Sequence, residues 1–408
     1  MATDIGVMVG GDVHKYTHTL VAVDRTGQER GCWSVGNEPA ALAGLVRALQ
    51  QLGAQAPGRL QVVLEDAHGN GARLADALLT AGLATATLAP GLIAQRRRRT
   101  TLHASKSDVE DARLIAKVAW IEPQHVRPVQ RPAPQQAALA HWHRWRTVLV
   151  RERRSICNLL HLHLYQTYPT YRDLLADPCS QAARRFWARF PTADQLAGVR
   201  RATVERVLAG PRGTRGLPAA TRARVWEKVH ALPASPSSEA TLALAAVIQA
   251  LLRRLTALDA DLAAATAALT AALPPAARLL LTIPGIQAPT AATIALALGD
   301  VARFSHGDAV ARFAGVAPRM WSSAQRGGLH TSNRGHRALH SALYLLALRR
   351  IAQPSLERTY FERKVDAGKP KRQALTCLMR QLCRVIYAIL RDHRPYVLPS
   401  SPALGGPA

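Results

Sequence analysis

Acidic side chains are scarce in this sequence. Its 408 residues include 27 Asp and Glu against 53 Lys and Arg, which gives a formal net charge of +26. GC-rich coding explains part of the Arg and Ala content, but it does not explain the shortage of acid. A charge of this size indicates a polyanionic partner. We therefore expect the chain to bind nucleic acid, with a membrane surface as the weaker alternative.

Cysteine is also rare, and the five copies are scattered: Cys32, Cys157, Cys179, Cys377 and Cys383. No Cys-x-x-Cys pair is present, which argues against a zinc site and against a disulfide scaffold. We expect no apolar run to reach the roughly 18 to 20 residues that a membrane-spanning helix needs. The start of the chain lacks the basic-then-apolar layout of a secretory signal. The prediction is a cytoplasmic protein with no membrane partner.

Strand-like and helix-like patterns alternate in the first third of the chain. Strands are expected over residues 5–12, 17–24, 59–65 and 83–90, and helices near 39–52, 72–82 and 108–120. Alternation of this kind indicates an α/β domain.

The few acidic residues of this region fall at particular places. Asp12 ends the first strand, Glu65 ends a later one, and Asp108 and Asp111 begin a helix. Residues three apart share a helix face, and ligands gather at strand ends of α/β sheets. Because clustered carboxylates need a counter-charge, the set predicts a site for Mg²⁺, which prefers oxygen ligands. The alternative is that these are helix caps and surface acids, since acid near a helix start is favourable in any case.

The middle of the chain contains a basic helical pattern with interleaved Trp and His. The His pairs 141/143 and 161/163 are two residues apart, on opposed sides of a helix, which argues against zinc. Trp142 and Trp145 suggest a face that contacts RNA or DNA. Further on, a narrow apolar seam runs from Leu244 to Leu269 in alternating steps of three and four. It predicts a coiled coil between molecules, with packing inside the chain as the alternative.

Three segments in the N-terminal third carry a family resemblance. GGDVHKYTHTLVAVD, LEDAHGNG and KSDVEDA resemble, in this order, the acidic boxes of the DEDD-type insertion-sequence transposases, the bridge-RNA-guided recombinases of the insertion sequence one-hundred-ten family. The resemblance implies an RNase H-like (RuvC-like) fold, with Mg²⁺ bound by Asp12, Glu65, Asp108 and Asp111. Lys15 and Lys106 stand at its basic positions and are expected to bind nucleic acid. Gly11 replaces the usual aliphatic residue.

The segment from Leu279 onward resembles the transposase domain of the same family. Helical patterns flank Pro284-Gly285-Ile286, like a helix-hairpin-helix turn that offers backbone N–H groups to phosphate. Gln287 stands where a second Gly is common, and an ordinary helical hairpin is the alternative.

The polar stretch WSSAQRGGLHTSNRGHR is expected to be a loop. The resemblance implies that it carries a nucleophilic Ser that forms a covalent phosphoserine link to DNA, with Ser323 favoured and Ser322 the alternative. Ala324 replaces a usual Gly. A Ser hydroxyl is a weak nucleophile unless it is deprotonated and the phosphate charge is offset. Arg326, Arg334 and Arg337 are the candidates for that offset.

Together these features predict four parts: a RuvC-like DEDD domain (1–128), a helical linker with coiled coil (129–274), a mainly helical transposase domain (275–395) and a disordered tail (396–408). The expected protein is a DNA recombinase of a mobile element, associated with the bacterial nucleoid when acting. Its expected partners are donor and target double-stranded DNA, a noncoding bridge RNA and further copies of itself, as a dimer or tetramer. The alternatives are a RuvC-like metal-dependent nuclease or junction resolvase without a covalent intermediate, an actin-like sugar kinase and a non-catalytic architectural binder.

Overall fold

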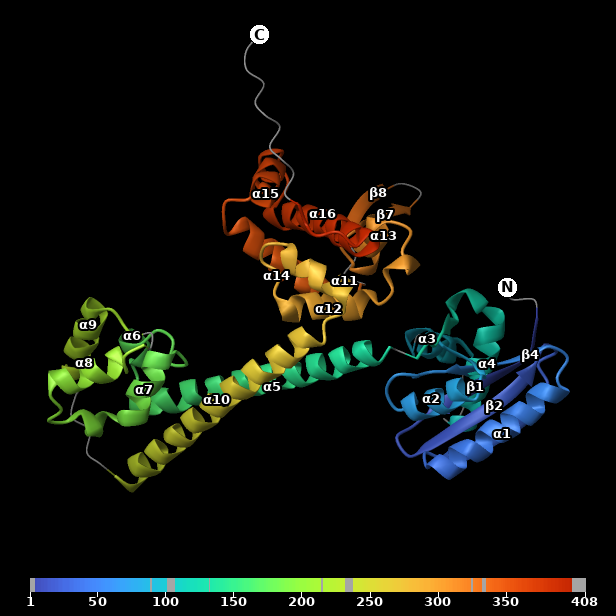
Figure 1. Ribbon diagram of the computed structural model, residues 1–408, viewed down its shortest axis with the longest axis horizontal. Coiled ribbons are helices and arrows are strands. Elements are labelled where there is room, and N and C mark those ends of the chain that lie inside the picture. The colour runs from blue at the N-terminus through green and yellow to red at the C-terminus, as the bar shows by residue number, and fades with distance from the viewer. Residues whose placement is uncertain are drawn as a thin grey trace, which may run out of the picture. The chain divides into compact units, whose positions relative to one another are not determined.

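The computed structural model describes residues 4–88, 90–100, 107–131, 133–213, 216–231, 238–323, 326–331 and 335–397. The chain divides into two compact units between Ala133 and Pro134 (Figure 1). The four-part division expected from the sequence stays a prediction. Most of its tail, residues 398–408, lies outside the described part.

A six-stranded sheet forms the centre of the first unit. Its strands and helices are β1 (Ile5–Val13), β2 (Thr17–Asp24), β3 (Glu29–Gly36), α1 (Pro39–Gln55), β4 (Arg59–Leu64), α2 (Ala72–Thr80), β5 (Ala84–Thr87), α3 (Pro90–Thr100), α4 (Asp108–Ile121), η1 (Pro123–His125) and β6 (Arg127–Pro128). The strand order is β3-β2-β1-β4-β5-β6. Strands β1, β2 and β3 pair antiparallel, β1, β4 and β5 pair parallel, and β6 is antiparallel to β5. The α/β domain expected from the sequence is confirmed.

Alternation along β1 gives each face of the sheet its own core. Val7 and Val9 face α1 and α2, where Leu45 and Leu74 complete one apolar cluster. The residues between them face α4, where Met8 packs among Ala112, Ile115 and Ala116 in a second cluster. The two helical layers lie on opposite sides of the strands (Figure 1). Asp12 belongs to the α4 face, because side chains two apart on a strand point the same way.

Gly10 lets α4 lie directly against β1. A Cβ at Gly10 would come within 2.1 Å of the Ala112 carbonyl oxygen and 2.4 Å of the Ala116 nitrogen. Any side chain there would push the helix away from the strand. The absence of a Cβ at this one position therefore sets how close the first turn of α4 comes to Asp12.

Four elements of this unit were not predicted: β3, α3, η1 and β6. Strand β3 is an edge strand whose residues are all exposed or half-buried, so it lacks the apolar run by which strands are found in a sequence. The stretch Arg96–Arg99 lies in α3. Arg96 bonds the largely buried Glu122 at the end of α4, so its charge is used within the fold.

The second unit is mostly helical. Its elements are α5 (Pro134–Thr167), α6 (Tyr171–Leu174), α7 (Gln181–Arg189), η2 (Ala193–Leu196), α8 (Arg201–Ala209), α9 (Ala219–His230), α10 (Glu239–Ala271), α11 (Pro275–Arg278), η3 (Leu279–Thr282), α12 (Ala288–Leu298), η4 (Val301–Arg303), α13 (Gly307–Phe313), β7 (Pro318–Ser323), β8 (Arg326–Thr331), α14 (Arg337–Ile351), α15 (Leu356–Asp366) and α16 (Lys371–Asp392).

The apolar seam of α10 packs inside the chain. Ile248 and Leu255 join a core with Leu160 of α5 and Phe186 of α7, and Leu258 packs with Leu149. Helices α5 and α10 run in opposite directions, since Arg146 bonds Thr266 while Arg153 bonds Asp259. The seam is therefore filled by α5, which is the packing that the sequence left as the alternative to a coiled coil between molecules.

Helix α10 also has the length and composition of a membrane span, with an 18-residue window of mean hydropathy 1.5. This corrects the expectation that no segment is long and apolar enough. In this unit, however, Asp259 of α10 forms ion pairs with Arg153 and Arg184, and the seam contacts α5 and α7. Core helices of proteins outside membranes pass the same test of length and composition, so one such helix is weak evidence of a span.

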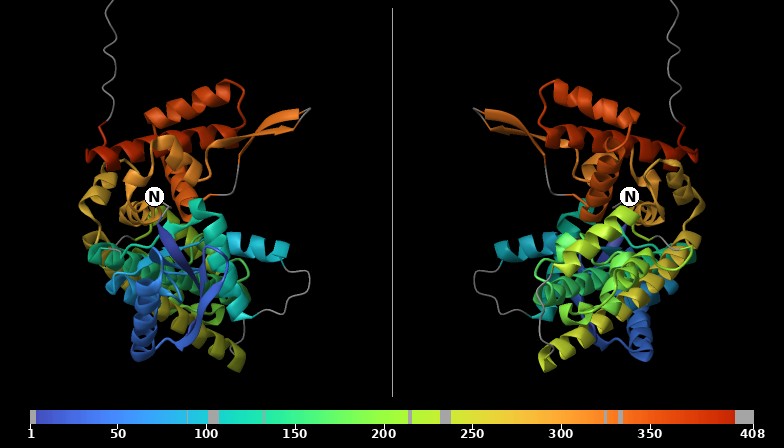
Figure 2. Two further views of the ribbon diagram at one scale, coloured as in Figure 1. Left: turned by 90° about the vertical axis from the view of Figure 1, so that its right-hand side faces the viewer. Right: turned by 90° about the vertical axis from the view of Figure 1, so that its left-hand side faces the viewer.

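A helical core and one hairpin make up the rest of the second unit. The core joins α12, α13, α14 and α16 around Leu298, Leu343 and Leu382. Asp308 at the start of α13 accepts hydrogen bonds from Arg380 and Arg384 of α16. Strands β7 and β8 form an antiparallel hairpin that projects from the helices (Figure 2). The stretch predicted to be a loop around Ser323 is thus largely strand.

We expect Gly10→Ala to lower the free energy of unfolding by about 1–3 kcal/mol, because the new methyl group overpacks the contact between β1 and α4. Gly44→Ala is the matched control. Gly44 lies within α1, and its Cβ would meet nothing closer than Arg47 at 4.0 Å. That change should leave stability equal or raise it by up to about 1 kcal/mol. Urea unfolding of both variants measures the difference, and equal stabilities would contradict the role given to Gly10.

Candidate functional site

Asp12 lies at the end of the central strand β1 and is 5% exposed. It pairs in register with Thr19 of β2, and on the other side β1 runs parallel to β4. A carboxylate in this position is fixed by strands on both sides. It therefore has little freedom to turn away from charges that approach from α4.

The first turn of α4 supplies those charges. Ser107 caps the helix by accepting a hydrogen bond from the Glu110 backbone N–H at 3.2 Å, so Asp108 does not act as the cap. Asp108 is exposed and Asp111 is 5% exposed. The two share a face because they are three residues apart. Glu110 is exposed on the same turn.

Electrostatics show that these acids lie together. Burial raises the pKa of Asp12 above its usual value, His14 opposes that rise, and the charges of Asp111 and Asp108 raise the pKa further. A raised pKa means that the carboxylate is less stable as an anion here than in water. Three of the four predicted acids, Asp12, Asp108 and Asp111, therefore lie close enough together for their charges to interact.

His14 is a member of the cluster that was not predicted from the sequence. Its Nε2 lies 3.2 Å from Asp12 Oδ2 and 3.6 Å from Asp108 Oδ1. Asp12 and His14 are two residues apart at the end of a strand, a spacing that places side chains on one face. That spacing was the available signal.

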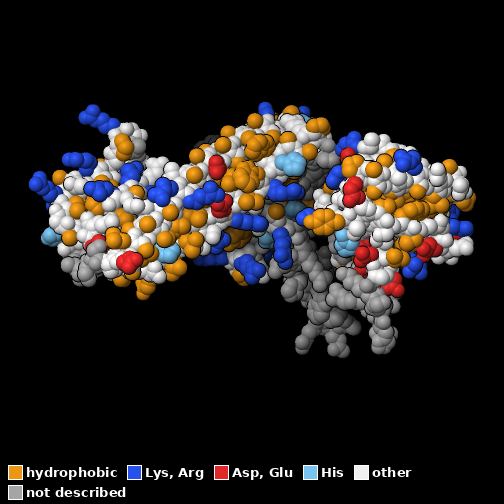
Figure 3. Space-filling view, turned by 90° about the horizontal axis from the view of Figure 1, so that it is seen from below, with side chains coloured by type: hydrophobic (Ala, Val, Ile, Leu, Met, Phe, Trp, Pro, Cys, Tyr) orange, Lys and Arg blue, Asp and Glu red, His pale blue; other side chains and the backbone are white. Residues whose placement is uncertain are grey.

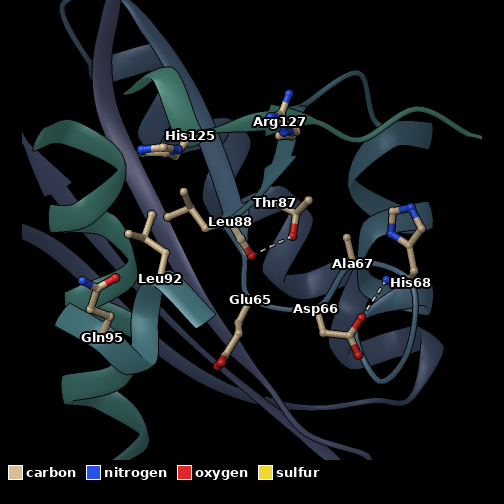
Figure 4. A pocket seen from close by; sticks show the side chains of 10 residues that line it. All are labelled: Glu65, Asp66, Ala67, His68, Thr87, Leu88, Leu92, Gln95, His125 and Arg127. Carbon is tan, nitrogen blue, oxygen red and sulfur yellow. Dashed lines mark hydrogen bonds between the residues drawn. The ribbon is translucent and has the colours of Figure 1, made fainter. Parts of the chain in front are cut away.

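Glu65 follows β4 and lies beside the end of β1. Its backbone N–H donates to the Gly11 carbonyl oxygen at 3.2 Å. Glu65 and Asp66 leave the strand in different directions (Figure 4). Asp66 accepts hydrogen bonds from the N–H groups of His68, Gly69 and Asn70, and these lower its pKa against the effect of burial. Asp66 thus stabilises the Gly-containing turn, while Glu65 remains the candidate for the acid site.

The cluster has the donor atoms that a divalent cation requires. One atom each of Asp12, His14 and Asp108 lies within 4.8 Å of the other two. Ligands held about 2.1 Å from one Mg²⁺ are roughly 3 to 4 Å apart, so the spacing is close to what one ion needs. Glu65 is not part of this three-residue group within the described structure. It is the next acid along the sheet edge.

Of the two basic residues predicted near the acids, the structure describes Lys15 but not Lys106. Lys15 lies in the turn after β1, exposed, with its Nζ 5.0 Å from the centre of the Tyr16 ring. Its exposure leaves it accessible to a phosphate. Lys106 lies outside the described residues.

The Pro284-Gly285 turn connects η3 to α12 in the second unit. Gly285 has a φ of +90°, which favours Gly, and the Ile286 N–H donates to the Ile283 carbonyl at 3.1 Å. This is the tight turn expected from Pro followed by Gly. Arg349 Nη1 donates to the Gly285 carbonyl oxygen at 3.2 Å, so α14 holds the turn in place.

The predicted serines lie on β7, at the end of the hairpin. Register places Ser323 opposite Arg326 and Ser322 opposite Gly327. Arg334 lies outside the described residues. Arg337 is the first residue of α14 and is exposed. The backbone thus brings one predicted Arg beside the favoured Ser.

Two family models match the chain. Residues 9–169 match a DEDD-type model described as "Transposase", and residues 277–362 match one described as "Transposase IS116/IS110/IS902 family". The first span contains all four acids, and the second contains both serines.

Curated relatives extend over almost the whole chain. The "Insertion element IS110 uncharacterized 43.6 kDa protein" of Streptomyces coelicolor is 28% identical over 95% of this chain and 95% of its own length. The corresponding 42 kDa protein of insertion element IS900 of Mycobacterium paratuberculosis is 27% identical over 96% and 97%. The "Pilin gene-inverting protein" of Moraxella bovis is 33% identical over 29% of this chain and 38% of its own length.

Among solved structures, Thermus thermophilus RuvC in complex with a Holliday junction substrate covers 30% of this chain and 99% of that chain, with 13% identity and a TM-score of 0.24. The two family models match successive parts of the chain, and its relatives from insertion elements match it nearly end to end. This chain therefore belongs to the IS116/IS110/IS902 family of transposases.

Proposed function

We propose that this transposase cuts and rejoins DNA through a phosphoserine intermediate formed by Ser323. In this step a Ser–O–P bond forms while one bridging P–O bond of the strand breaks. The proton lost by the Ser323 hydroxyl is balanced by the one taken up by the departing sugar oxygen, which leaves as a free hydroxyl. Arg326, opposite Ser323 in the hairpin register, and the exposed Arg337 would offset the phosphate charge, since guanidinium matches phosphate geometry. Arg334 completes the proposed set.

The acid cluster is the observation that carries the proposal. Burial raises the pKa of Asp12, and the charges of Asp111 and Asp108 raise it further. A cluster of this kind suits a hard cation, which prefers oxygen ligands. With Glu65 the three acids would hold Mg²⁺, which when bound polarises a phosphate oxygen and neutralises developing charge. His14 stands at the edge of this set, with its Nε2 3.2 Å from Asp12 Oδ2.

Nucleic-acid binding is proposed for the basic surface of the molecule. Lys and Arg side chains are spread over the face in Figure 3, with fewer acidic ones among them. A net charge of +26 favours contacts to the phosphate backbone, which carry no sequence information. We propose that a noncoding bridge RNA supplies that information by base pairing with donor and target DNA. The protein would then read backbone and shape. A dimer or tetramer is the proposed assembly.

One specific observation favours a second candidate function. The acid cluster lies within the first unit alone, so a metal-dependent nuclease in which water attacks the phosphate would need no Ser from the second unit. The two functions differ in whether protein becomes covalently attached to DNA.

The first prediction of this proposal concerns Ser323. Ser323→Ala should abolish covalent protein–DNA adducts, because the methyl side chain of Ala has no atom that can attack phosphorus. The substrate is DNA that carries the ends of the encoding element, together with RNA transcribed from its flank. Denaturing gels detect the adduct, and mass spectrometry locates the phosphoserine.

Ser322→Ala is the matched control and should retain the adduct. Loss of the adduct in Ser322→Ala alone would assign the nucleophile to Ser322. Strand cutting at the wild-type rate by both variants would establish the nuclease alternative instead.

The second prediction concerns cation binding. Asp12→Asn should weaken Mg²⁺ binding by at least about tenfold, which is the scale of losing a group that supports a metal site. Because the pKa of Asp12 is raised from 3.8, protons displace the cation at a higher pH than at an ordinary carboxylate. Affinity in the wild type should therefore fall as the pH is lowered through that raised value.

Calorimetric titration of Mg²⁺ at several pH values measures both effects. Glu110→Gln is the control, because Glu110 is exposed on the same helical turn and should leave affinity unchanged. Equal losses in both variants would show that binding depends only on general negative charge.

A further inference from the structure

A cavity of about 540 Å³ opens beside Glu65, at the carboxyl ends of β4 and β5. Leu88 and Leu92 form an apolar wall, and polar side chains stand around it on separate elements (Figure 4). Gln95 comes from α3, and Arg127 from β6. The volume lies within the roughly 300 to 1,000 Å³ of small-molecule sites, which are typically apolar with a few polar groups.

Two polar side chains at this cavity have no partner among the residues that the structure describes. Gln95 and Arg127 are both exposed, and neither makes a side-chain hydrogen bond or ion pair with another described residue. Their neighbour Arg96, by contrast, is bonded to Glu122. An amide offers a donor and an acceptor in one plane, and a guanidinium matches a phosphate. The apolar wall, the amide and the guanidinium together complement a ligand that has a flat apolar ring, a polar ring edge and an attached anionic group.

We propose that this cavity receives one unpaired nucleotide of the DNA strand that is cut, an inference that rests on the proposed function. The base lies against Leu88 and Leu92, its polar edge meets Gln95, and its phosphate meets Arg127. The nucleotide must be unpaired, because a base inside a duplex is stacked and cannot enter a pocket.

The position of the cavity links it to the acid cluster. Glu65 lines the cavity, and its N–H bonds Gly11, the residue before Asp12. A nucleotide held here directs the neighbouring phosphate of its strand toward the cation site. The nearby Asp66 does not prevent this, because its carboxylate already accepts three backbone N–H groups. The cavity is thus a positioning site for the phosphate that reacts.

Binding of short single strands tests the inference without any cutting. The probes are a nonamer of thymidylate and a nonamer of abasic nucleotides, both in Ca²⁺, with affinity measured by fluorescence anisotropy of the full chain. Stacking of one base on protein contributes about 1–3 kcal/mol. Leu92→Trp, which fills the cavity, should therefore weaken binding of the thymidylate strand about tenfold and leave the abasic strand unchanged.

Two further variants separate the contribution of the base from that of the phosphate. Gln95→Ala should also weaken only the thymidylate strand, whereas Arg127→Ala should weaken both probes, since it contacts phosphate. Arg59→Ala is the control for charge: Arg59 is exposed at the opposite end of β4 and should change either probe less than Arg127→Ala. Equal thermal unfolding midpoints establish that the variants are folded.

Three outcomes overturn the inference. In the first, Leu92→Trp and Gln95→Ala affect both probes equally. In the second, they affect neither. In the third, a nonamer of uridylate loses affinity in these variants while thymidylate does not, which would assign the cavity to RNA.

Asp12→Asn separates this inference from the proposed function, because it should lose Mg²⁺-dependent cutting and keep the preference for thymidylate over the abasic strand. If the wild type cuts no DNA, the proposed function fails even where the binding result stands.

Discussion

Repulsion between carboxylates at short range is the constraint on which the first unit depends. Asp12 is buried between strands, and the first turn of α4 brings Asp108 and Asp111 to it. Helix α4 can lie this close to β1 because Gly10 has no Cβ, which would otherwise clash with the α4 backbone. The fold thus holds like charges together at the expense of its own stability, with His14 as the partial offset. An arrangement of this kind is explained by a cation that binds there, since structural acids would be separated or paired with Arg.

Several acids elsewhere in the chain are paired with Arg. Asp24 bonds Arg30, Asp259 bonds Arg153 and Arg184, and Asp308 bonds two residues of α16. A chain with about twice as many basic as acidic residues has Arg available almost everywhere. Within the described part of the chain, Asp12 and Asp108 instead lie beside the imidazole of His14. This contrast, more than the count of acids, marks the cluster as a site.

Much of the first unit could be predicted, because its parallel strands and its helices follow simple periodicities. Asp12 and Glu65 were found from strand ends, and Asp108 and Asp111 from helical spacing. What escaped prediction depends on tertiary pairing. Strand β3 is positioned by its neighbour β2, and the hairpin around Ser323 has Gly and polar residues that suit a loop equally well. The apolar seam of α10 was predicted correctly as a packing face, but the spacing of its residues does not specify which helix packs against it.

The two kinds of charge in this protein act over different distances. At about 0.1 M salt, screening limits interactions between exposed charges to roughly 10 Å, so the excess of Lys and Arg holds DNA on the surface without fixing one phosphate. The ligand atoms of Asp12, His14 and Asp108 lie within 4.8 Å of one another, partly buried, where a cation and its phosphate interact strongly. Under the proposed function, basic charge would capture the polymer, and the acid cluster would select the bond that reacts. A strand captured by charge alone would slide, and a cavity beside Glu65 that takes one base is what would stop it at a single phosphate.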